Sequence, residues 1–420
     1  MSQHFDTLET RTPQEREVAL MSALPAQIAN AKAHAPAFAE LLRDVDGTQI
    51  NSRVALARLP VLRKHQLLER QHALRDKDPL GGFSTIGWKG MIRPNGVRRI
   101  YQSPGPIYEP EGHASDYWRA ARAMKAAGFE TGDLVHNCFS YHLTPGAWIM
   151  ESGAHALGCA VFPGGVGNTE QQLAAVADLR PVAYAGTPSF LKILLEKAQE
   201  SGHKLSFTKA LVSGEACPPS LRDWFTQRGV AVFQCYATAD VGLIAYETAS
   251  REGLVLDEGV IVEIVRPGTG DPVPEGEVGE LVITTLNPDY PLIRFGTGDL
   301  SAILPGTCPT GRTGQRIKGW MGRADQTTKI RGMFVHPGQV AEIVKRFPEV
   351  RKARLVVTGE MANDQMALHV ETDHLSDEAL KARVSEAVRD VTKLRGEVHL
   401  VQSGSLANDG KVIEDARSYQ

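Results

Sequence analysis

Short apolar runs recur through the middle of the chain at intervals of about 20 to 30 residues, and stretches with helical periodicity separate them. The runs begin near Leu134, Cys159, Val182, Ala210 and Val230, and the helical stretches include 111–127, 188–200 and 218–227. This alternation is typical of repeated β-α-β units and predicts an α/β fold with a mainly parallel sheet. Because ligands collect at the carboxyl ends of such strands, we expect site residues there.

The pattern changes after Tyr236. Segments 260–265, 278–284 and 299–304 are β-rich and punctuated by Pro and Gly, which predicts a smaller β-rich subdomain. Beyond residue 325 we expect helices at 339–347 and 376–394 and strands at 353–357, 366–371 and 398–401. This order suits a small α+β lid domain. The sequence therefore predicts a large N-terminal domain, 1–324, and a mobile C-terminal lid, 325–420.

Composition narrows the class of partner. The chain has 46 basic and 49 acidic residues, which gives no electrostatic basis for binding nucleic acid or an anionic membrane. No apolar stretch approaches the ~18 residues of a membrane span. Five scattered cysteines fit neither a disulfide framework nor a paired zinc motif, and the first thirty residues lack an apolar run. These features predict a cytoplasmic protein with a small-molecule partner.

Several short motifs occur in a characteristic order, and each is weak alone. They are Pro-Leu-Ile-Arg-Phe-Gly-Thr-Gly-Asp at 291–299, Gly-Arg-Ala-Asp at 322–325, Lys-Ile-Arg-Gly at 329–332 and Asn-Asp-Gly-Lys at 408–411. In this order and spacing the chain resembles the adenylate-forming (AMP-binding) enzymes, and within them the phenylacetate–CoA ligase family. The resemblance implies an acid–CoA ligase that uses ATP, releases AMP, requires Mg²⁺ and acts on a small, aromatic carboxylic acid. The oligomeric state stays open, with a homodimer as one alternative.

The resemblance implies which residues hold the nucleotide. Asp299 would bind the ribose hydroxyls, and Tyr236 would stack on adenine. Gly214 and Glu215, at the end of a predicted strand, would line the adenine or acyl pocket. The alternatives are a turn-capping Asp and a core Tyr.

Further polar residues are expected around the phosphates. Asp240 stands where the family has a Glu that holds Mg²⁺, although an Asp that caps a helix is the alternative. Ala239 replaces the Ser or Thr that binds the α-phosphate, and Thr238 is the neighbouring hydroxyl. Arg312 and Arg323 are candidates for phosphate or ribose contacts, with surface salt bridges as the alternative.

The catalytic lysine and the acyl pocket also follow from the resemblance. Lys411 matches the lysine that reaches the reacting oxygens during adenylation, and Asp325 matches the hinge about which the lid rotates. A surface lysine and a loop aspartate are the alternatives. Phe139, Tyr141 and His142 occupy the loop that borders the acyl pocket, where ordinary packing is the alternative.

Residues 102–110 depart from the family pattern. The family has a hydroxyl- and glycine-rich loop with a lysine that cradles the triphosphate, whereas this chain has three prolines and no lysine. Glu109 and Glu111 would repel phosphate. Two rival functions therefore remain open: an adenylate- or CoA-binding protein without adenylation, and an enzyme that performs only the thioester half-reaction.

Overall fold

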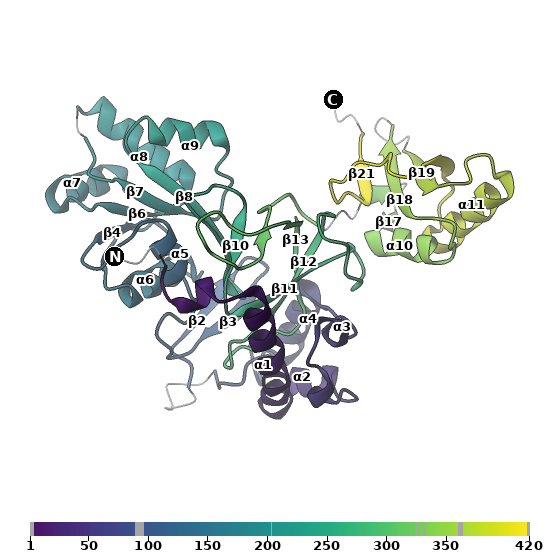
Figure 1. Cartoon of the computed structure of the whole chain (residues 1–420), viewed down its shortest axis with the longest axis horizontal. Coiled ribbons are helices and arrows are strands. Elements are labelled where there is room, and N and C mark those ends of the chain that lie inside the picture. The colour runs from purple at the N-terminus through teal and green to yellow at the C-terminus, as the bar shows by residue number, and fades with distance from the viewer. Residues whose placement is uncertain are drawn as a thin grey trace. The chain divides into compact units, whose positions relative to one another are not determined.

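The computed structural model describes residues 4–88, 96–202, 204–324, 326, 328–330, 333–359 and 364–417 (Figure 1). The chain divides into two compact units. Unit 1 comprises 1–262, 283–295 and 304–320, and unit 2 comprises 263–282, 296–303 and 321–420. The boundary predicted between 324 and 325 stays a prediction.

A long sheet forms the centre of unit 1. Its strands follow the order β14-β15-β10-β9-β8-β7-β6-β4-β5, and β5, β4, β6, β7 and β8 are parallel to one another. Their bounds are β4 (Leu134–Asn137), β5 (Ala160–Pro163), β6 (Ala183–Gly186), β7 (Lys209–Val212) and β8 (Ala231–Thr238). The predicted parallel sheet is confirmed.

The remaining strands extend this sheet beyond β8. They are β9 (Gly242–Glu247), β10 (Leu254–Leu256), β14 (Ile303–Leu304) and β15 (Arg316–Ile317). Strand β9 is antiparallel to both β8 and β10, and β10 is antiparallel to β15. The sheet therefore changes from parallel to antiparallel directly after the segment that contains Tyr236.

Helices connect the parallel strands, as the crossover geometry requires. Helix α5 (Ala121–Ala126) precedes β4, and the connecting helices are α6 (Gly146–Ala156), α7 (Thr169–Leu179), α8 (Pro188–Glu200) and α9 (Pro219–Thr226). The expectation of one helix over 111–127 was wrong. Strand β3 (Ile107–Glu111) ends in that range, and Asp116 has a φ of +46°, which interrupts a right-handed helix. The Asp116 carboxylate instead accepts hydrogen bonds from the amides of Ala120 and Ala121.

The N-terminal segments of unit 1 are helical. They comprise η1 (Thr7–Thr10), α1 (Pro13–His34), α2 (Pro36–Leu41), η2 (Gly47–Gln49), α3 (Arg53–Leu56) and α4 (Lys64–Leu74). Strand β2 (Arg99–Ser103) pairs with β3 as an antiparallel hairpin, with Ser103 opposite Ile107. The loop that departs from the family pattern is therefore the tip and second strand of this hairpin.

The predicted β-rich segment forms a further sheet in the order β1-β13-β12-β11. Its strands are β1 (Leu62–Arg63), β11 (Val260–Val265), β12 (Gly279–Thr285) and β13 (Phe295–Ser301). Every residue of β11 and β12 is buried, including the polar residues Glu263 and Glu280 among their apolar neighbours.

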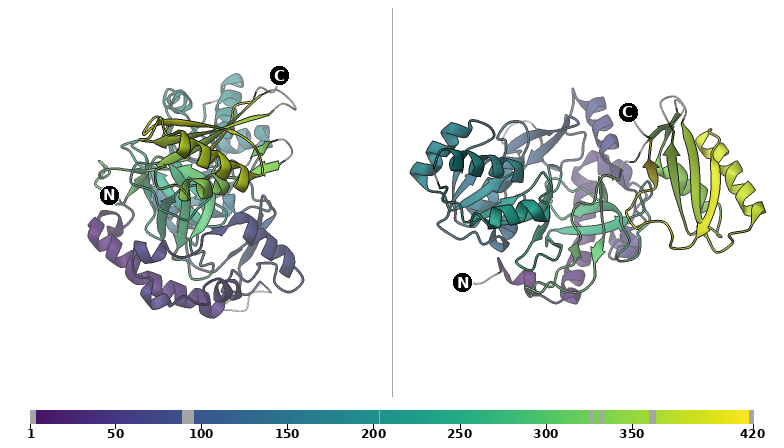
Figure 2. Two further views of the ribbon diagram at one scale, coloured as in Figure 1. Left: turned by 90° about the vertical axis from the view of Figure 1, so that its right-hand side faces the viewer. Right: turned by 90° about the horizontal axis from the view of Figure 1, so that it is seen from above.

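The C-terminal part of unit 2 forms an α+β layer around its own core. A sheet in the order β20-β19-β18-β21 packs with helices α10 (Pro337–Lys345) and α11 (Glu378–Thr392) (Figure 2). Its strands are β18 (Lys352–Thr358), β19 (Gln365–Thr372), β20 (Glu397–Gln402) and β21 (Ile413–Asp415). A separate two-stranded sheet consists of β16 (Thr328–Ile330) and β17 (Met333–Val335). Helices and strands share one apolar cluster, which holds the layer together.

Two sequence expectations can be compared with the described residues. No helix in this part of the chain has both the length and the apolar character that a membrane span requires. All five cysteines are buried and free, as expected from their spacing.

Candidate active site

Loops that follow the parallel strands of unit 1 meet at one edge of the sheet. Phe139 follows β4, Thr187 follows β6 and Gly214 follows β7. A Cβ built on Gly214 would lie 3.8 Å from Phe139 Cε1 and 3.9 Å from Thr187 Cγ2. Gly214 has a φ of +81°, which L-residues rarely adopt, so glycine is required by the backbone here. The structure therefore brings two predicted pocket residues, Phe139 and Gly214, together.

The loop after β4 is fixed by polar contacts. The Tyr141 hydroxyl donates a hydrogen bond to Glu151 Oε2 over 2.8 Å and accepts one from Asn137 Nδ2 over 3.0 Å. The Tyr141 ring meets Trp148 edge to face with centroids 5.2 Å apart. His142 is exposed on the same loop. Tyr141 and Trp148 thus form an aromatic pair in this region, while His142 faces solvent.

Strand β8 carries the predicted adenine contact. Tyr236 is largely buried and pairs with Ala245 of β9, and a register shift follows it before Ala237. Glu215 follows β7, the strand that pairs with β8 in parallel. Its carboxylate accepts a hydrogen bond from the amide of Ser189. The Thr238 hydroxyl accepts a hydrogen bond from the amide of Val241. That hydroxyl keeps a hydrogen to donate.

A charged cluster lies beyond the end of β8. The Asp240 side chain is fully buried, and its Oδ2 lies 2.8 Å from Lys64 Nζ. Within the described part of the chain, no hydrogen-bond partner lies near the second oxygen, Oδ1. Burial, and then the charge of Asp240, raises the pKa of Glu109 to about 9. Glu109 Oε1 accepts a hydrogen bond from the Ser103 hydroxyl. The cluster therefore combines the Lys64–Asp240 ion pair with a Glu109 carboxyl group whose pKa is raised.

This arrangement corrects the expectation that Glu109 and Glu111 repel phosphate. Glu109 is fully buried and protonated near neutral pH. Glu111 is also buried, where it lies 2.9 Å from Arg99 Nη1 and accepts a hydrogen bond from the Tyr101 hydroxyl. Neither side chain presents an uncompensated negative charge to solvent, because one is neutral and the other is paired.

In unit 2, the predicted ribose contact is paired with an arginine. Arg323 Nη1 lies 2.7 Å from Asp299 Oδ1 in β13, and the two residues form a β-bridge. Gly298 lets the guanidinium approach, because a Cβ at that position would lie 2.7 Å from Arg323 Nη2. The structure therefore places two candidate nucleotide-binding residues, Asp299 and Arg323, in direct contact.

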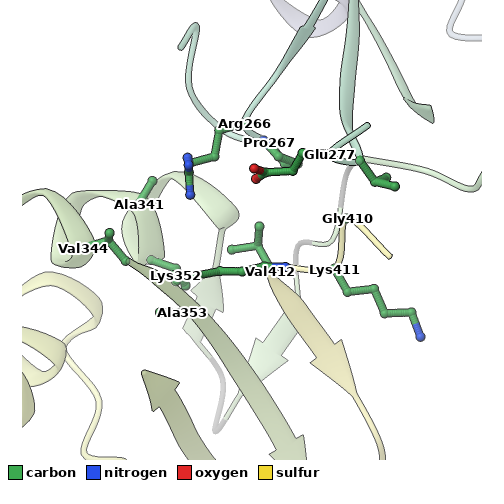
Figure 3. Close-up of a pocket in the computed structure, with 12 residues that line it drawn as sticks. Arg266, Pro267, Glu277, Ala341, Val344, Lys352, Ala353, Gly410, Lys411 and Val412 are labelled. Atoms are coloured by element: carbon green, nitrogen blue, oxygen red, sulfur yellow. The ribbon is translucent and has the colours of Figure 1, made fainter. Parts of the chain in front are cut away.

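Lys411 lies in a pocket of unit 2. Figure 3 shows it beside Gly410 and Val412, with its ammonium group directed away from Arg266. The Lys411 amide donates a hydrogen bond to Asp409 Oδ1. Gly410 packs so closely that a Cβ would lie 2.7 Å from Val278 Cγ1. The segment that carries Lys411 is therefore held at its backbone while its side chain is exposed.

Two candidate residues remain, Arg312 and Asp325. Arg312 is buried, with its Nε 2.7 Å from Glu9 Oε2 and its Nη1 donating a hydrogen bond to the Thr310 hydroxyl. Its guanidinium therefore has buried partners within unit 1. Asp325 lies outside the described residues.

Sequence reasoning missed two residues that shape the site. Lys64 lies far from every recognised motif, and only its ion pair with Asp240 reveals it. Arg294 lies within the 291–299 motif but is buried, and its guanidinium donates hydrogen bonds to the carbonyls of Ala57 and Leu59. The sequence signal that could have identified Arg294 was its position as a charged residue inside an apolar run.

Comparison with family models identifies the class of protein. Residues 114–287 match the model described as AMP-binding enzyme, and residues 332–415 match AMP-binding enzyme C-terminal domain. The two matches cover the parallel sheet and the C-terminal α+β layer. The chain is thus an adenylate-forming enzyme.

Relatives narrow this class to a family. The chain is 30% identical to a phenylacetate-coenzyme A ligase of Thermus thermophilus, over 83% of each chain. It is also 30% identical to the corresponding ligase of Pseudomonas putida, over 80% of each chain. The chain belongs to the phenylacetate–CoA ligase family and is an AMP-forming acid–CoA ligase.

A solved structure supports the fold over nearly the whole chain. It is that of a 2-hydroxyisobutyryl-CoA ligase in complex with 2-HIB-AMP and CoA. The TM-score is 0.70 at 26% identity, and the alignment covers 99% of this chain and 93% of that chain. The α/β fold class predicted from the sequence is confirmed.

Proposed function

We propose that this enzyme activates a small aromatic carboxylic acid. The carboxylate oxygen attacks the α-phosphorus of ATP, and pyrophosphate leaves to give an acyl adenylate. The thiolate of CoA then attacks the acyl carbon, and AMP leaves. The observation that carries this proposal is membership of the phenylacetate–CoA ligase family over most of the chain.

Aromatic side chains support the proposed acid class. Phe139, Tyr141 and Trp148 lie around the loop after β4, and Phe139 lies close to Gly214 at the sheet edge. Flat apolar walls favour a flat ligand, and aromatic pairs gain energy beyond the area they bury. Tyr236 and Glu215, at the ends of adjacent parallel strands, would contact the adenine. Thr238 would donate to the α-phosphate in place of Ala239.

Asp240 would hold Mg²⁺ together with phosphate oxygens. Magnesium is commonly bound through one or two carboxylates plus substrate phosphates. The unpartnered buried oxygen Oδ1 of Asp240 fits this role. Among the residues that the structure describes, no group of three or more His, Cys, Asp or Glu side chains could hold a metal without substrate. The ion would neutralise phosphate charge as pyrophosphate leaves.

In unit 2, Asp299 and Arg323 would bind the ribose, and Lys411 would stabilise charge on the acyl and phosphate oxygens. Asp325 would be the hinge between the domains 1–324 and 325–420.

Arg312 would support the nucleotide site through its buried pair with Glu9 rather than by direct contact. His142 would border the entrance to the acyl pocket.

The test is a panel of aryl and short aliphatic acids assayed for pyrophosphate release with ATP and Mg²⁺, and for thioester formation with CoA. We expect aryl acids such as phenylacetate and benzoate to exceed acetate and butyrate in kcat/KM. A preference for acetate or butyrate would contradict the aromatic assignment.

The absent hydroxyl at Ala239 and the proline-rich hairpin favour one second candidate, an enzyme limited to the thioester half-reaction. Synthetic acyl adenylates distinguish it. Conversion of an adenylate to a thioester, without pyrophosphate release from any acid, would replace the two-step proposal. Nucleotide binding without either reaction would indicate a binding protein.

Cytoplasmic location and a homodimer stay predictions. The five buried, free cysteines are consistent with a reducing compartment. Size-exclusion chromatography with light scattering would measure the mass in solution against the monomer mass of 45.7 kDa.

A further inference from the structure

Lys64 is held in a fixed position at the start of α4. Its neighbour Leu62 donates a backbone hydrogen bond to the carbonyl of Arg294 over 2.9 Å. The buried Arg294 side chain in turn binds two carbonyls of the segment that precedes Leu62. At its other side, α4 is joined to the hairpin by Gln71, which exchanges two hydrogen bonds with the backbone of Tyr108. The base of the Lys64 side chain is therefore anchored to the sheet and to the hairpin.

The Lys64 ammonium group lies at a boundary between buried and exposed surroundings. The Asp240 side chain that it contacts is 0% exposed, whereas the Lys64 side chain is 38% exposed. The ammonium also lies 5.7 Å from the centre of the Phe295 ring. An ammonium group has three hydrogen-bond donors, and Lys64 directs one of them to Asp240. Lys64 can therefore keep Asp240 and still donate to a ligand on its exposed side.

Two buried carboxyl groups, those of Asp240 and Glu109, belong to the same cluster as Lys64. Asp240 Oδ1 and Glu109 Oε2 are both buried, and neither has a hydrogen-bond partner among the residues that the structure describes. Glu109 Oε1 accepts a hydrogen bond from the Ser103 hydroxyl, and Asp240 is the carboxylate that Lys64 contacts directly. The cluster also lies next to the hairpin, because Glu109 belongs to β3 and accepts a hydrogen bond from Ser103 of β2. Residues 102–110 of this hairpin contain no lysine.

We propose that Lys64 binds the β- and γ-phosphates of ATP, and that this lysine from α4 replaces the cation missing from the hairpin. This inference rests on the proposed function, because it assigns the triphosphate to the same site. It explains how an adenylate-forming enzyme can use ATP with a proline-rich hairpin.

The experiment measures binding by calorimetry on the full chain in Mg²⁺-free buffer, with ATP, AMP and inorganic tripolyphosphate as probes. The variants are Lys64→Ala, Lys64→Arg, Asp240→Asn and the double variant Lys64→Ala/Asp240→Asn. Lys192→Ala is the matched control, because Lys192 pairs with Glu196 on α8 and its side chain is 43% exposed. Circular dichroism and urea unfolding check that each variant folds.

We expect Lys64→Ala to weaken binding of ATP and tripolyphosphate about tenfold or more, the scale of one charge-assisted hydrogen bond. AMP binding should change about threefold or less, because AMP has no β- or γ-phosphate. Lys64→Arg should retain part of the affinity, and Lys192→Ala should bind as the wild type does.

The double variant separates ligand binding from a structural role. Removing Lys64 alone leaves Asp240 buried and unpaired, which can disturb the site by itself. If the loss of ATP affinity persists in the double variant, Lys64 contacts the phosphates. If wild-type affinity returns there, if AMP weakens as much as ATP, or if wild type does not bind tripolyphosphate, the proposal is overturned. Lys64-dependent ATP binding without pyrophosphate release would instead contradict the proposed function alone.

Discussion

The charge beside the hairpin depends on the protonation of single side chains. Glu109 shows how burial changes the protonation of a carboxyl group. In water a glutamate is negative at neutral pH, but here the cost of burying a charge exceeds the cost of keeping the proton. Burial and the nearby Asp240 raise the pKa of Glu109 to about 9. The proton is therefore part of the folded structure.

Stability should depend on pH through Glu109. A carboxyl group with a raised pKa in the folded state contributes stability that is fully present below its ordinary pKa near 4.5 and is lost as pH rises through about 9. The free energy of unfolding of the wild type should therefore fall between pH 5 and 9. Urea unfolding of Glu109→Gln, which cannot ionise, should show a smaller fall.

The control for this measurement is Glu170→Gln, on the exposed first turn of α7. Its pH dependence should match that of the wild type. An equally steep pH dependence in Glu109→Gln and wild type would show that other groups are responsible.

Lys411 permits a test of the two-step reaction at the residue scale. Its side chain is exposed while its backbone is held, so alanine should remove the charge without disturbing the fold. Lys411→Ala should lower carboxylate-dependent pyrophosphate release by roughly 10²-fold, the scale of losing one charge-stabilising group. Capture of a synthetic acyl adenylate by CoA should change little. Equal losses in both half-reactions would contradict a role limited to adenylation.

At the scale of elements, the hairpin and α4 depend on one side chain. Gln71 is buried on α4; its Nε2 donates to the Tyr108 carbonyl and its Oε1 accepts from the Tyr108 amide, at 2.8 and 2.9 Å. The amide side chain thereby replaces the strand partner that β3 lacks on this side. It also joins α4, which begins with Lys64, to β3, which contains Glu109.

Gln71→Ala should lower the free energy of unfolding by about 2 kcal/mol, because it leaves backbone groups of Tyr108 unsatisfied. It should also weaken ATP binding more than AMP binding, since the hairpin and Lys64 lose their common support. Urea unfolding and calorimetry measure the two effects. Unchanged stability would show that water replaces both hydrogen bonds.

At the scale of the molecule, the C-terminal α+β layer has a core of its own. The apolar cluster that joins α10, α11 and the strands contains only residues between Ile330 and Ile413. Within unit 2, the segment before Lys411 makes a few polar contacts to the β-rich part, such as Asn408 Oδ1 with the amide of Val278. The core, and not these contacts, should hold the layer folded.

A fragment of residues 325–420 should therefore fold alone. Circular dichroism should show helix and strand, and urea unfolding should be cooperative. Loss of the contacts through Asn408 should leave the cooperativity intact. A fragment without cooperative unfolding would contradict the predicted division at 325.

The sequence by itself determined the parallel sheet, the α+β layer and the family. Apolar periodicity reports burial on one or both faces of an element, and motif order survives where single residues change. The ends of elements were less certain: 111–127 has helical composition, yet the positive φ of Asp116 delays α5 until Ala121.

Only the tertiary structure decided the charges of the site. Lys64 and Asp240 are 176 residues apart in sequence, and no pattern along the chain links them. Glu109 in the sequence is an acid, and its proton follows from burial beside Asp240. Periodicity is a local property of the chain, whereas desolvation and ion pairing depend on which distant segments meet in the fold.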